Sequence, residues 1–178
     1  DEVKEEKKTA KTEKEIQTFE DSTAKIAALR VDDRLIHGQV MTAWLKRYPA
    51  KQIIIIDDGV AKDDFMASVL QMAAPSGVKV RVFSCEKAIQ AMGKGIKNPT
   101  ILLAKSPITY KRMIDGGLDL TAINIGGMGI NETRKTFHKN IAASEEEKEA
   151  MRNLLDRGVD VKIQVIPQDK VVEVRSLL

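Results

Sequence analysis

The sequence of 178 residues predicts an α/β fold with three layers, in which helices cover both faces of a mainly parallel central sheet of about seven strands. Three observations support this prediction. Short, apolar, β-branched runs recur along the chain, and most are separated by stretches with helical periodicity. The runs are continuously apolar, as is typical of strands that are buried on both faces. Glycines follow several helical stretches, where a helix is expected to stop.

Seven runs are expected to be strands because each is short, apolar and rich in β-branched residues. They cover residues 26–31, 52–57, 78–83, 100–104, 121–125, 140–143 and 161–166. Most gaps between them are long enough for a crossover helix, so the strands that flank such a helix are expected to run parallel.

Helices are expected where apolar residues recur at helical spacing. These stretches cover residues 39–48, 64–73, 86–92, 108–114 and 145–155. In the second of them, Phe65, Val69 and Leu70 can share one face. Ser144 and the three glutamates after it are typical of a capped helix start with an acidic first turn. The methionines of the helical stretches are expected to fill the core; they are Met66, Met72, Met92, Met113 and Met151.

Residues 1–24 are expected to form a tether that precedes a domain over residues 25–178. They hold 8 acidic and 5 basic side chains but only five hydrophobic residues, too few to offset the entropy of ordering the segment. A cloning remnant or a solvated helix on the domain are the alternatives, since Ile16 and Phe19 lie at helical spacing.

The composition argues against several classes of protein. A single cysteine excludes a disulfide framework and a cysteine-based zinc site. The longest apolar stretches, such as residues 53–56, have the length of strands, so no membrane span is expected. The whole chain carries +3 and residues 1–24 contribute −3, which leaves +6 for the domain, and aromatic residues are only 4%. A net charge of this size, with so few aromatic residues, is too weak a signal for nucleic-acid binding. We expect a cytoplasmic protein without a metal or cofactor.

Ligands of parallel α/β sheets bind beyond the carboxyl ends of the strands, where loops lead into helices. The first such loop holds the strongest candidate for chemistry, His37. The helix that follows it offers free amides and a partial positive charge, which favour an anion. Arg34 carries a guanidinium that matches phosphate geometry. A neutral imidazole is a competent nucleophile near pH 7, and Asp32 or Asp33 could fix the ring tautomer or brace Arg34. These residues suggest a histidine that carries a phosphoryl group.

Plainer interpretations of the same residues stay open at this point. A lone histidine in a loop is often only a surface side chain. Lys105 and Ser106 could contact the same phosphate, or they could only cap the helix that Pro107 begins. Glycines at residues 126–129 could admit a ligand or form a tight turn. His138 is expected to lie in a solvated hairpin, because Arg134 and other basic residues surround it.

The segment RVDDRLIHGQV at residues 30–40 closely resembles the active-site loop of one family. This family is the IIB component of the mannose/fructose/sorbose family of the phosphoenolpyruvate-dependent sugar phosphotransferase system. The resemblance runs from about residue 26 to the C-terminus. It includes the strand at 53–57, the Ser-Pro pair at 106–107, the segment NIGGM at 124–128 and the segment RGV at 157–159.

The resemblance implies a mainly parallel α/β domain and a defined activity. The histidine that matches His37 accepts a phosphoryl group on Nδ1 from a phosphohistidine of the IIA component. It passes the group to a sugar that the membrane IIC and IID subunits transport, and the arginine that matches Arg34 helps to hold it. The chain would then be a protein-N(pi)-phosphohistidine–sugar phosphotransferase, held at the inner face of the cell membrane through its partners. Mannose, glucose, fructose, sorbose and amino sugars remain open as substrates.

Further phosphate contacts are predicted from the placement of the loops. These secondary candidates are Asp32, Gly38, Gln39, Lys105, Ser106, Gly126 and Gly127. Two other functions are the alternatives. Similar folds build nucleotide-binding domains, although the expected place of a phosphate-cradling glycine pattern holds Asp-Asp-Arg here. A non-catalytic regulatory module would leave His37 unmodified.

Overall fold

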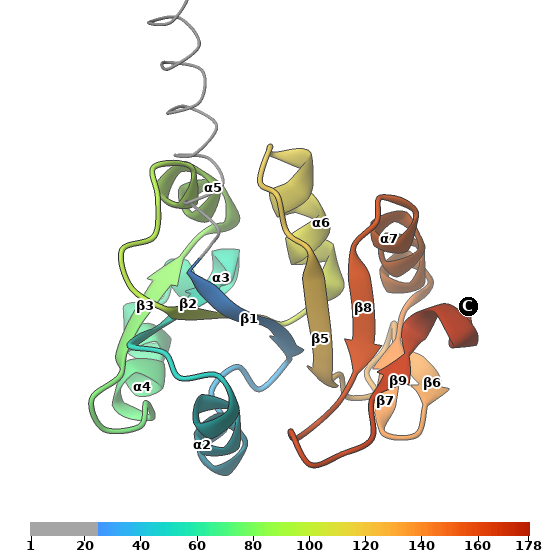
Figure 1. Ribbon diagram of the computed structural model, residues 1–178, viewed down its shortest axis with the longest axis horizontal. Coiled ribbons are helices and arrows are strands. Elements are labelled where there is room, and N and C mark those ends of the chain that lie inside the picture. The colour runs from blue at the N-terminus through green and yellow to red at the C-terminus, as the bar shows by residue number, and fades with distance from the viewer. Residues whose placement is uncertain (1–24) are drawn as a thin grey trace, which may run out of the picture.

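A seven-stranded sheet forms the centre of the computed structural model, in the order β3-β2-β4-β1-β5-β8-β9 (Figure 1). The structure describes residues 25–178, so the expected tether at residues 1–24 lies outside the described residues. Six strands run parallel, and only β9 at one edge is antiparallel to its neighbour. The strands are β1 (Ile26–Asp32), β2 (Gln52–Ile56), β3 (Lys79–Phe83), β4 (Thr100–Ala104), β5 (Ala122–Gly127), β8 (Asp160–Ile163) and β9 (Val172–Glu173).

Helices cover both faces of the sheet, as the sequence predicted. One face carries α5 (Cys85–Gly93), α6 (Pro107–Asp115) and α7 (Glu145–Asp156). The other carries α2 (Gly38–Arg47), α3 (Asp58–Ala61) and α4 (Asp64–Met72). A short 3₁₀ helix, η1 (Val174–Leu177), follows β9. The longest helix within residues 25–178, α7, has 12 residues, and no helix of that range has the length and apolarity of a membrane span.

The core has one cluster on each side of the sheet, because the central strands are apolar on both faces. In β2, Ile54 and Ile56 pack toward α5–α7, while Ile53 and Ile55 pack toward α2–α4. All five residues of β2 and all five of β4 are buried. The continuously apolar runs of the sequence are therefore the strands at the centre of a three-layer domain.

The sheet has the predicted number of strands but not the predicted set. The run at 140–143 forms β7 (Ile141–Ala143), which pairs antiparallel with β6 (Lys135–His138) in a separate hairpin. No helix separates β7 from β6, so the chain reverses at once, with Lys139 in a left-handed conformation (φ 51°). The seventh strand is β9, whose two residues are too few to leave a recognisable apolar pattern.

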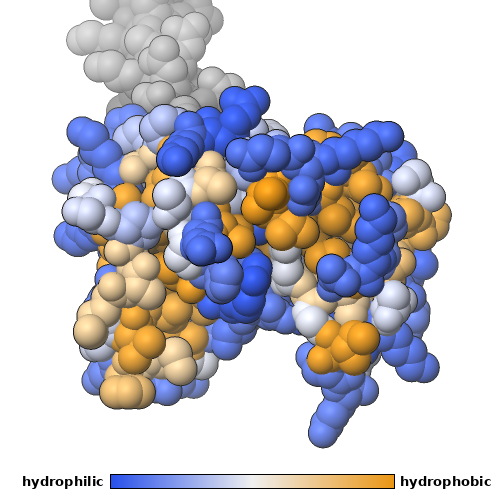
Figure 2. Space-filling view, turned by 90° about the horizontal axis from the view of Figure 1, so that it is seen from below, coloured by the Kyte–Doolittle hydropathy of each residue, from blue (hydrophilic) through white to orange (hydrophobic). Residues whose placement is uncertain are grey.

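Two expectations about helices were wrong. No helix was expected at residues 58–61, where the structure has the four-residue helix α3. Met66 and Met72 of α4 were expected in the core, yet they are exposed, and so are Phe65 and Val69. Helix α4 lies beside β3, the strand at the edge of the sheet (Figure 1), and only the side of α4 that carries Leu70 packs into the core. Figure 2, seen from below, shows hydrophobic side chains gathered on the left, where α4 lies. Met92, Met113 and Met151 are buried as expected.

Candidate active site

The sheet topology creates a switch point at the carboxyl end of β1. The chain leaves β1 through α2 on one face of the sheet, and it leaves the neighbouring strand β4 through α6 on the other face. Loops that diverge in this way open a crevice outside the strand ends, which is where ligands of such sheets bind. The loops that carry His37 and Lys105 both begin at this point.

The loop from β1 to α2 exposes Arg34 and His37 because the two residues between them are buried. Leu35 and Ile36 pack into the core cluster beneath α2–α4. The amide of Leu35 donates to the carbonyl of Asp32 (2.9 Å), and Leu35 has φ 60°. This left-handed conformation is unfavourable for a branched side chain and is kept where the surroundings enforce it. Apolar packing therefore fixes the loop and leaves its polar side chains at the surface.

His37 is the N-cap residue of α2 and is exposed to solvent. Its carbonyl accepts the amide of Met41 (2.9 Å), and its imidazole makes no capping bond. The ring therefore stands beside the first turn of the helix, which contains the predicted phosphate ligands Gly38 and Gln39. Free amides and the helix dipole make this end favourable for an anion. The structure thus places the imidazole where the sequence predicted it.

Asp32 holds the guanidinium of Arg34 in one orientation. The carboxylate accepts Arg34 Nε (3.0 Å) and Nη2 (2.9 Å), and one of its oxygens also accepts the Arg34 amide (3.0 Å). Asp32 is 1% exposed and the Arg34 side chain is 44% exposed. The hydrogen bonds to Asp32 raise the pKa of Arg34 above its ordinary value, so the cation is permanent. Asp32 thus braces Arg34. Because a carboxylate repels a phosphate, this geometry does not favour a direct contact between Asp32 and the anion, which stays a prediction.

Arg30 lies behind Asp32 in the interior and is 1% exposed. Its Nη2 is 3.6 Å from Asp32, and its guanidinium also donates to Asn124 (2.6 Å) and to the first two backbone carbonyls after β8. The Cζ atom of Arg30 lies 4.8 Å from the centre of the Trp44 indole ring. Burial lowers the pKa of Arg30 to about 10 even though Asp32 favours its charged form. Arg30 is therefore a cation at neutral pH, and Asp32 bridges two guanidinium groups.

Gly126 and Gly127 make room for this buried ion cluster. A Cβ at Gly126 would lie 2.0 Å from the guanidinium of Arg30, and one at Gly127 would lie 2.7 Å from the carboxylate of Asp32. Packing against Arg30 and Asp32 therefore requires glycine at both positions, which the sequence alone did not reveal. A contact between their backbone and a phosphate stays a prediction.

Lys105 and Ser106 lie at the end of β4, beside the same crevice. Ser106 caps α6 by accepting the amide of Ile108 (3.3 Å), and it donates to Glu147 (2.7 Å). Its hydroxyl is therefore engaged within the fold, as the capping interpretation predicted. Lys105 is 46% exposed, and its Nζ is 4.0 Å from Asp57. A cation on a half-exposed side chain remains able to turn toward an anion at the crevice.

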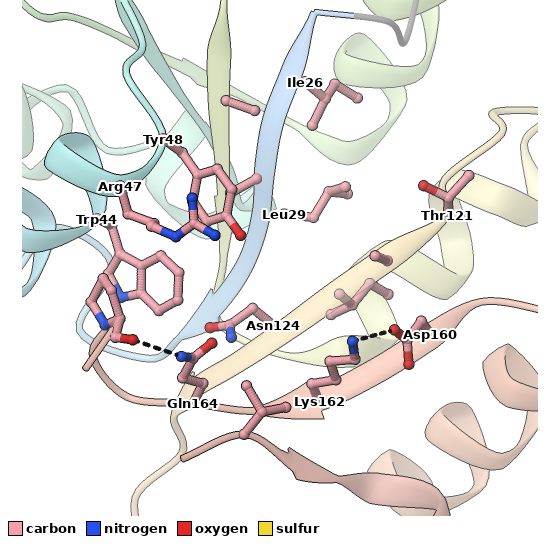
Figure 3. A pocket seen from close by; sticks show the side chains of 16 residues that line it. Ile26, Leu29, Trp44, Arg47, Tyr48, Thr121, Asn124, Asp160, Lys162 and Gln164 are labelled. Atoms are coloured by element: carbon pink, nitrogen blue, oxygen red, sulfur yellow. Dashed lines mark hydrogen bonds and ion pairs between the residues drawn. The ribbon is translucent and has the colours of Figure 1, made fainter. Parts of the chain in front are cut away.

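A groove of about 430 Å³ lies elsewhere on the domain. It occupies a part of the sheet face that none of the helices within residues 25–178 covers, next to the end of α2 (Figure 3). Its walls include Trp44, Arg47, Tyr48, Asn124, Lys162 and Gln164. Neither Arg34 nor His37 lines it. Within residues 25–178, no group of three or more potential ligands is arranged to hold a metal ion. The candidate site is thus an exposed loop, to which another macromolecule has access.

Sequence reasoning missed three buried charged residues that support the site. These are Arg30, Arg134 and Glu147. The spacing of Arg30 and Asp32 was the available signal, since residues two apart lie on the same face of a strand. Arg134 was expected in a solvated hairpin but is buried, because its carboxylate partners lie elsewhere in the fold, Asp33 in the loop after β1 and Glu147 in the first turn of α7. His138 does lie in the predicted hairpin, in β6.

The family model that matches the chain describes the sorbose subfamily IIB component of the phosphotransferase system, over residues 26–178. The N-acetylgalactosamine-specific phosphotransferase enzyme IIB component 1 of Escherichia coli K12 is 33% identical, over 82% of this chain and 93% of the relative. The mannose-specific EIIAB component of the same strain is 31% identical, and the match covers 86% of this chain and 48% of that longer relative. The crystal structure of the IIBSor domain of the sorbose permease from Klebsiella pneumoniae is similar, with a TM-score of 0.77 and 34% identity over 85% of this chain and 94% of that domain.

Proposed function

The chain belongs to the sorbose-subfamily IIB components of the phosphotransferase system, and from this premise we propose that His37 is its phosphoryl acceptor. The donor is a phosphohistidine of a IIA component, and the final acceptor is a sugar bound to membrane IIC and IID subunits. The observation that carries the proposal is the exposed imidazole at the start of α2, in the same loop as an arginine that a buried carboxylate holds in place. A relative that combines IIA and IIB in one protein supports IIA as the donor.

Transfer to His37 exchanges one phosphorus–nitrogen bond for another. The lone pair of the neutral His37 Nδ1 attacks phosphorus, and the donor imidazole leaves with the electrons of the broken bond. Such transfer depends on positioning and on stabilising the charge of the three equatorial oxygens. Arg34 and the amides of Gly38 and Gln39 are suited to this task, because they are N–H donors within three residues of His37 in the chain.

The second transfer releases the group to a sugar hydroxyl. The oxygen attacks phosphorus, the bond to Nδ1 breaks, and the hydroxyl proton is lost as the new ester forms. His37 returns to its starting form, so the domain is a carrier in each cycle. An exposed loop suits both steps, because two different partners must reach the same nitrogen. We place the domain at the cytoplasmic face of the membrane, where the membrane subunits hold it.

The two alternatives have less support. A nucleotide-binding domain requires a glycine pattern that cradles phosphate, and the loop after β1 contains buried apolar residues and two aspartates instead. A regulatory module would not need a permanently charged guanidinium fixed in the loop that carries the imidazole.

A labelling experiment tests the proposal, and the chain has only two histidines. The protein is incubated with radiolabelled phosphoenolpyruvate, the general phosphotransfer proteins and the IIA domain of a mannose-type relative. We expect acid-labile label on the wild type and on His138→Gln, and none on a folded His37→Gln. Label that persists on His37→Gln, or a wild type that takes no phosphate from IIA or from phosphoramidate, would refute the assignment.

A further inference from the structure

The side chain of Arg134 joins three loops and a helix, although it lies far from His37 in sequence. It is only 9% exposed. Its Nη1 donates to Asp33 in the loop that carries His37 (3.1 Å), and its Nη2 donates to the carbonyl of Lys105 in the loop after β4 (3.1 Å). Its Nε and Nη2 donate to the two oxygens of Glu147 in the first turn of α7 (2.8 and 2.9 Å).

Glu147 makes a rigid anchor for this arginine. Besides Arg134, it accepts the hydroxyl of Ser106 (2.7 Å) and the amide of Ser144 (3.1 Å). Burial alone would raise the pKa of Glu147, but the hydrogen bonds from Arg134, Ser106 and Ser144 outweigh burial and lower it. The carboxylate is therefore charged at neutral pH and fully engaged. One end of Arg134 is thus fixed to α7 by two charge-assisted hydrogen bonds, the strong kind in proteins.

Asp33 has different partners from Asp32. Its Oδ2 accepts both Arg134 Nη1 and the amide of Gly129 (2.7 Å), and its own amide donates to the carbonyl of Gly127 (2.9 Å). Asp32 bonds to Arg34 within the loop. Two consecutive carboxylates therefore fix the turn before His37, one by its link to Arg34 and the other by its link to Arg134.

We propose that Arg134 is a positioning residue for phosphoryl transfer, because it fixes the His37 loop and the Lys105 loop relative to each other through Asp33 and Glu147. The inference rests on the proposed function of His37. A buried ion cluster is a poor source of stability, since apolar residues of similar volume often stabilise a fold as well. Such a cluster does fix the relative positions of the side chains and loops that it joins. Displacement of a reacting group by about 1 Å can cost about 100-fold in rate, so a loop that presents a nucleophile benefits from such fixing.

Asp33→Asn is the first test variant, because it weakens the link to the loop and leaves the Arg134–Glu147 pair intact. The rate of transfer from phosphorylated IIA is measured at several IIA concentrations, together with the melting temperature. A positioning role predicts a kcat lowered about 10- to 100-fold, an unchanged KM and little change in melting temperature. Arg134→Lys, which can still reach one carboxylate, should be less impaired than Arg134→Met.

Two controls separate the inference from a general loss of charge and from failure of the proposed function. Arg152→Met removes an exposed arginine that pairs with Glu149 on α7, and it should leave transfer unchanged. Amide hydrogen exchange of unphosphorylated protein tests the link without any transfer: residues 34–37 should exchange faster in Asp33→Asn than in the wild type. If the wild type takes no phosphate on His37, the proposed function fails while the exchange result still stands. Equal kcat and equal exchange in Asp33→Asn and the wild type would overturn the role of Arg134.

Discussion

The buried carboxylate of Asp32 holds the half-exposed guanidinium of Arg34 at two nitrogens, Nε at 3.0 Å and Nη2 at 2.9 Å. A planar fork is matched to a carboxylate in this way, and an ammonium group cannot reproduce it. The orientation of the cation nearest to His37 in the chain is therefore set from inside the protein. This relationship leads to the first prediction.

Arg34→Lys should keep the charge but lose the fixed geometry. We expect transfer from phosphorylated IIA to His37 to slow about 100-fold, since loss of one preorganised donor to a transition-state oxyanion has that order of effect. Quench-flow measurements at saturating IIA give the rate. Arg157→Lys, an exposed arginine paired with Asp115, is the matched control and should transfer at the wild-type rate. Equal rates for the two variants would remove Arg34 from the site.

Gly126→Ala should destabilise the fold, because its methyl group would overlap the guanidinium of Arg30. Forcing an extra carbon into a packed interior costs about 1–3 kcal/mol, and here it would also displace a buried cation. Urea unfolding measures the loss. Gly93→Ala, near the end of α5, meets no atom within 4 Å and should be neutral or stabilise by up to about 1 kcal/mol. A fully stable Gly126→Ala would show that the buried cluster does not need this space.

Glu147 should make stability depend on acid pH. Its pKa is lowered on folding from 4.5, so its contribution is fully present above that value and is lost as pH falls through the folded pKa. The difference in unfolding free energy between the wild type and Glu147→Gln should therefore be largest near pH 7 and shrink below about pH 4.5. Glu149→Gln, an exposed substitution in the same helix, should differ little from the wild type at any pH. A difference for Glu147→Gln that does not change with pH would contradict the assignment.

Lys105→Met tests whether this cation contacts the phosphate. One unit charge near a doubly charged group in a solvated site contributes on the order of 1–2 kcal/mol, so transfer should slow about tenfold. Lys111→Met removes a cation that pairs with Asp115 on α6 and should not affect transfer. If both variants transfer at the wild-type rate, the phosphate is bound without Lys105.

The sheet could be predicted from the sequence because its central strands are buried on both faces. Runs such as residues 53–56 then have no polar residue to break the pattern. The elements that were missed are short: α3 has four residues and β9 has two. Elements of this size form through contacts with the rest of the fold, and local sequence carries little information about them.

The site was predictable only where its residues lie next to one another in sequence. Asp32, Arg34 and His37 lie within six consecutive residues, so the amino-acid sequence itself shows their grouping. Arg30 and Arg134 were missed because their partners come from distant parts of the chain: Asn124 is 94 residues from Arg30, and Asp33 is 101 residues from Arg134. Burial of these arginines depends on carboxylates and carbonyls that only the fold assembles.

The most direct test of the account is nuclear magnetic resonance of the protein labelled with ¹⁵N in its two histidines, before and after phosphorylation through IIA. We predict that the chemical shifts of the His37 ring nitrogens change and that Nδ1 shows coupling to phosphorus, while the chemical shifts of the His138 ring nitrogens stay the same. Phosphate on His138, on a residue other than histidine, or on neither ring would contradict the central claim that His37 carries the phosphoryl group.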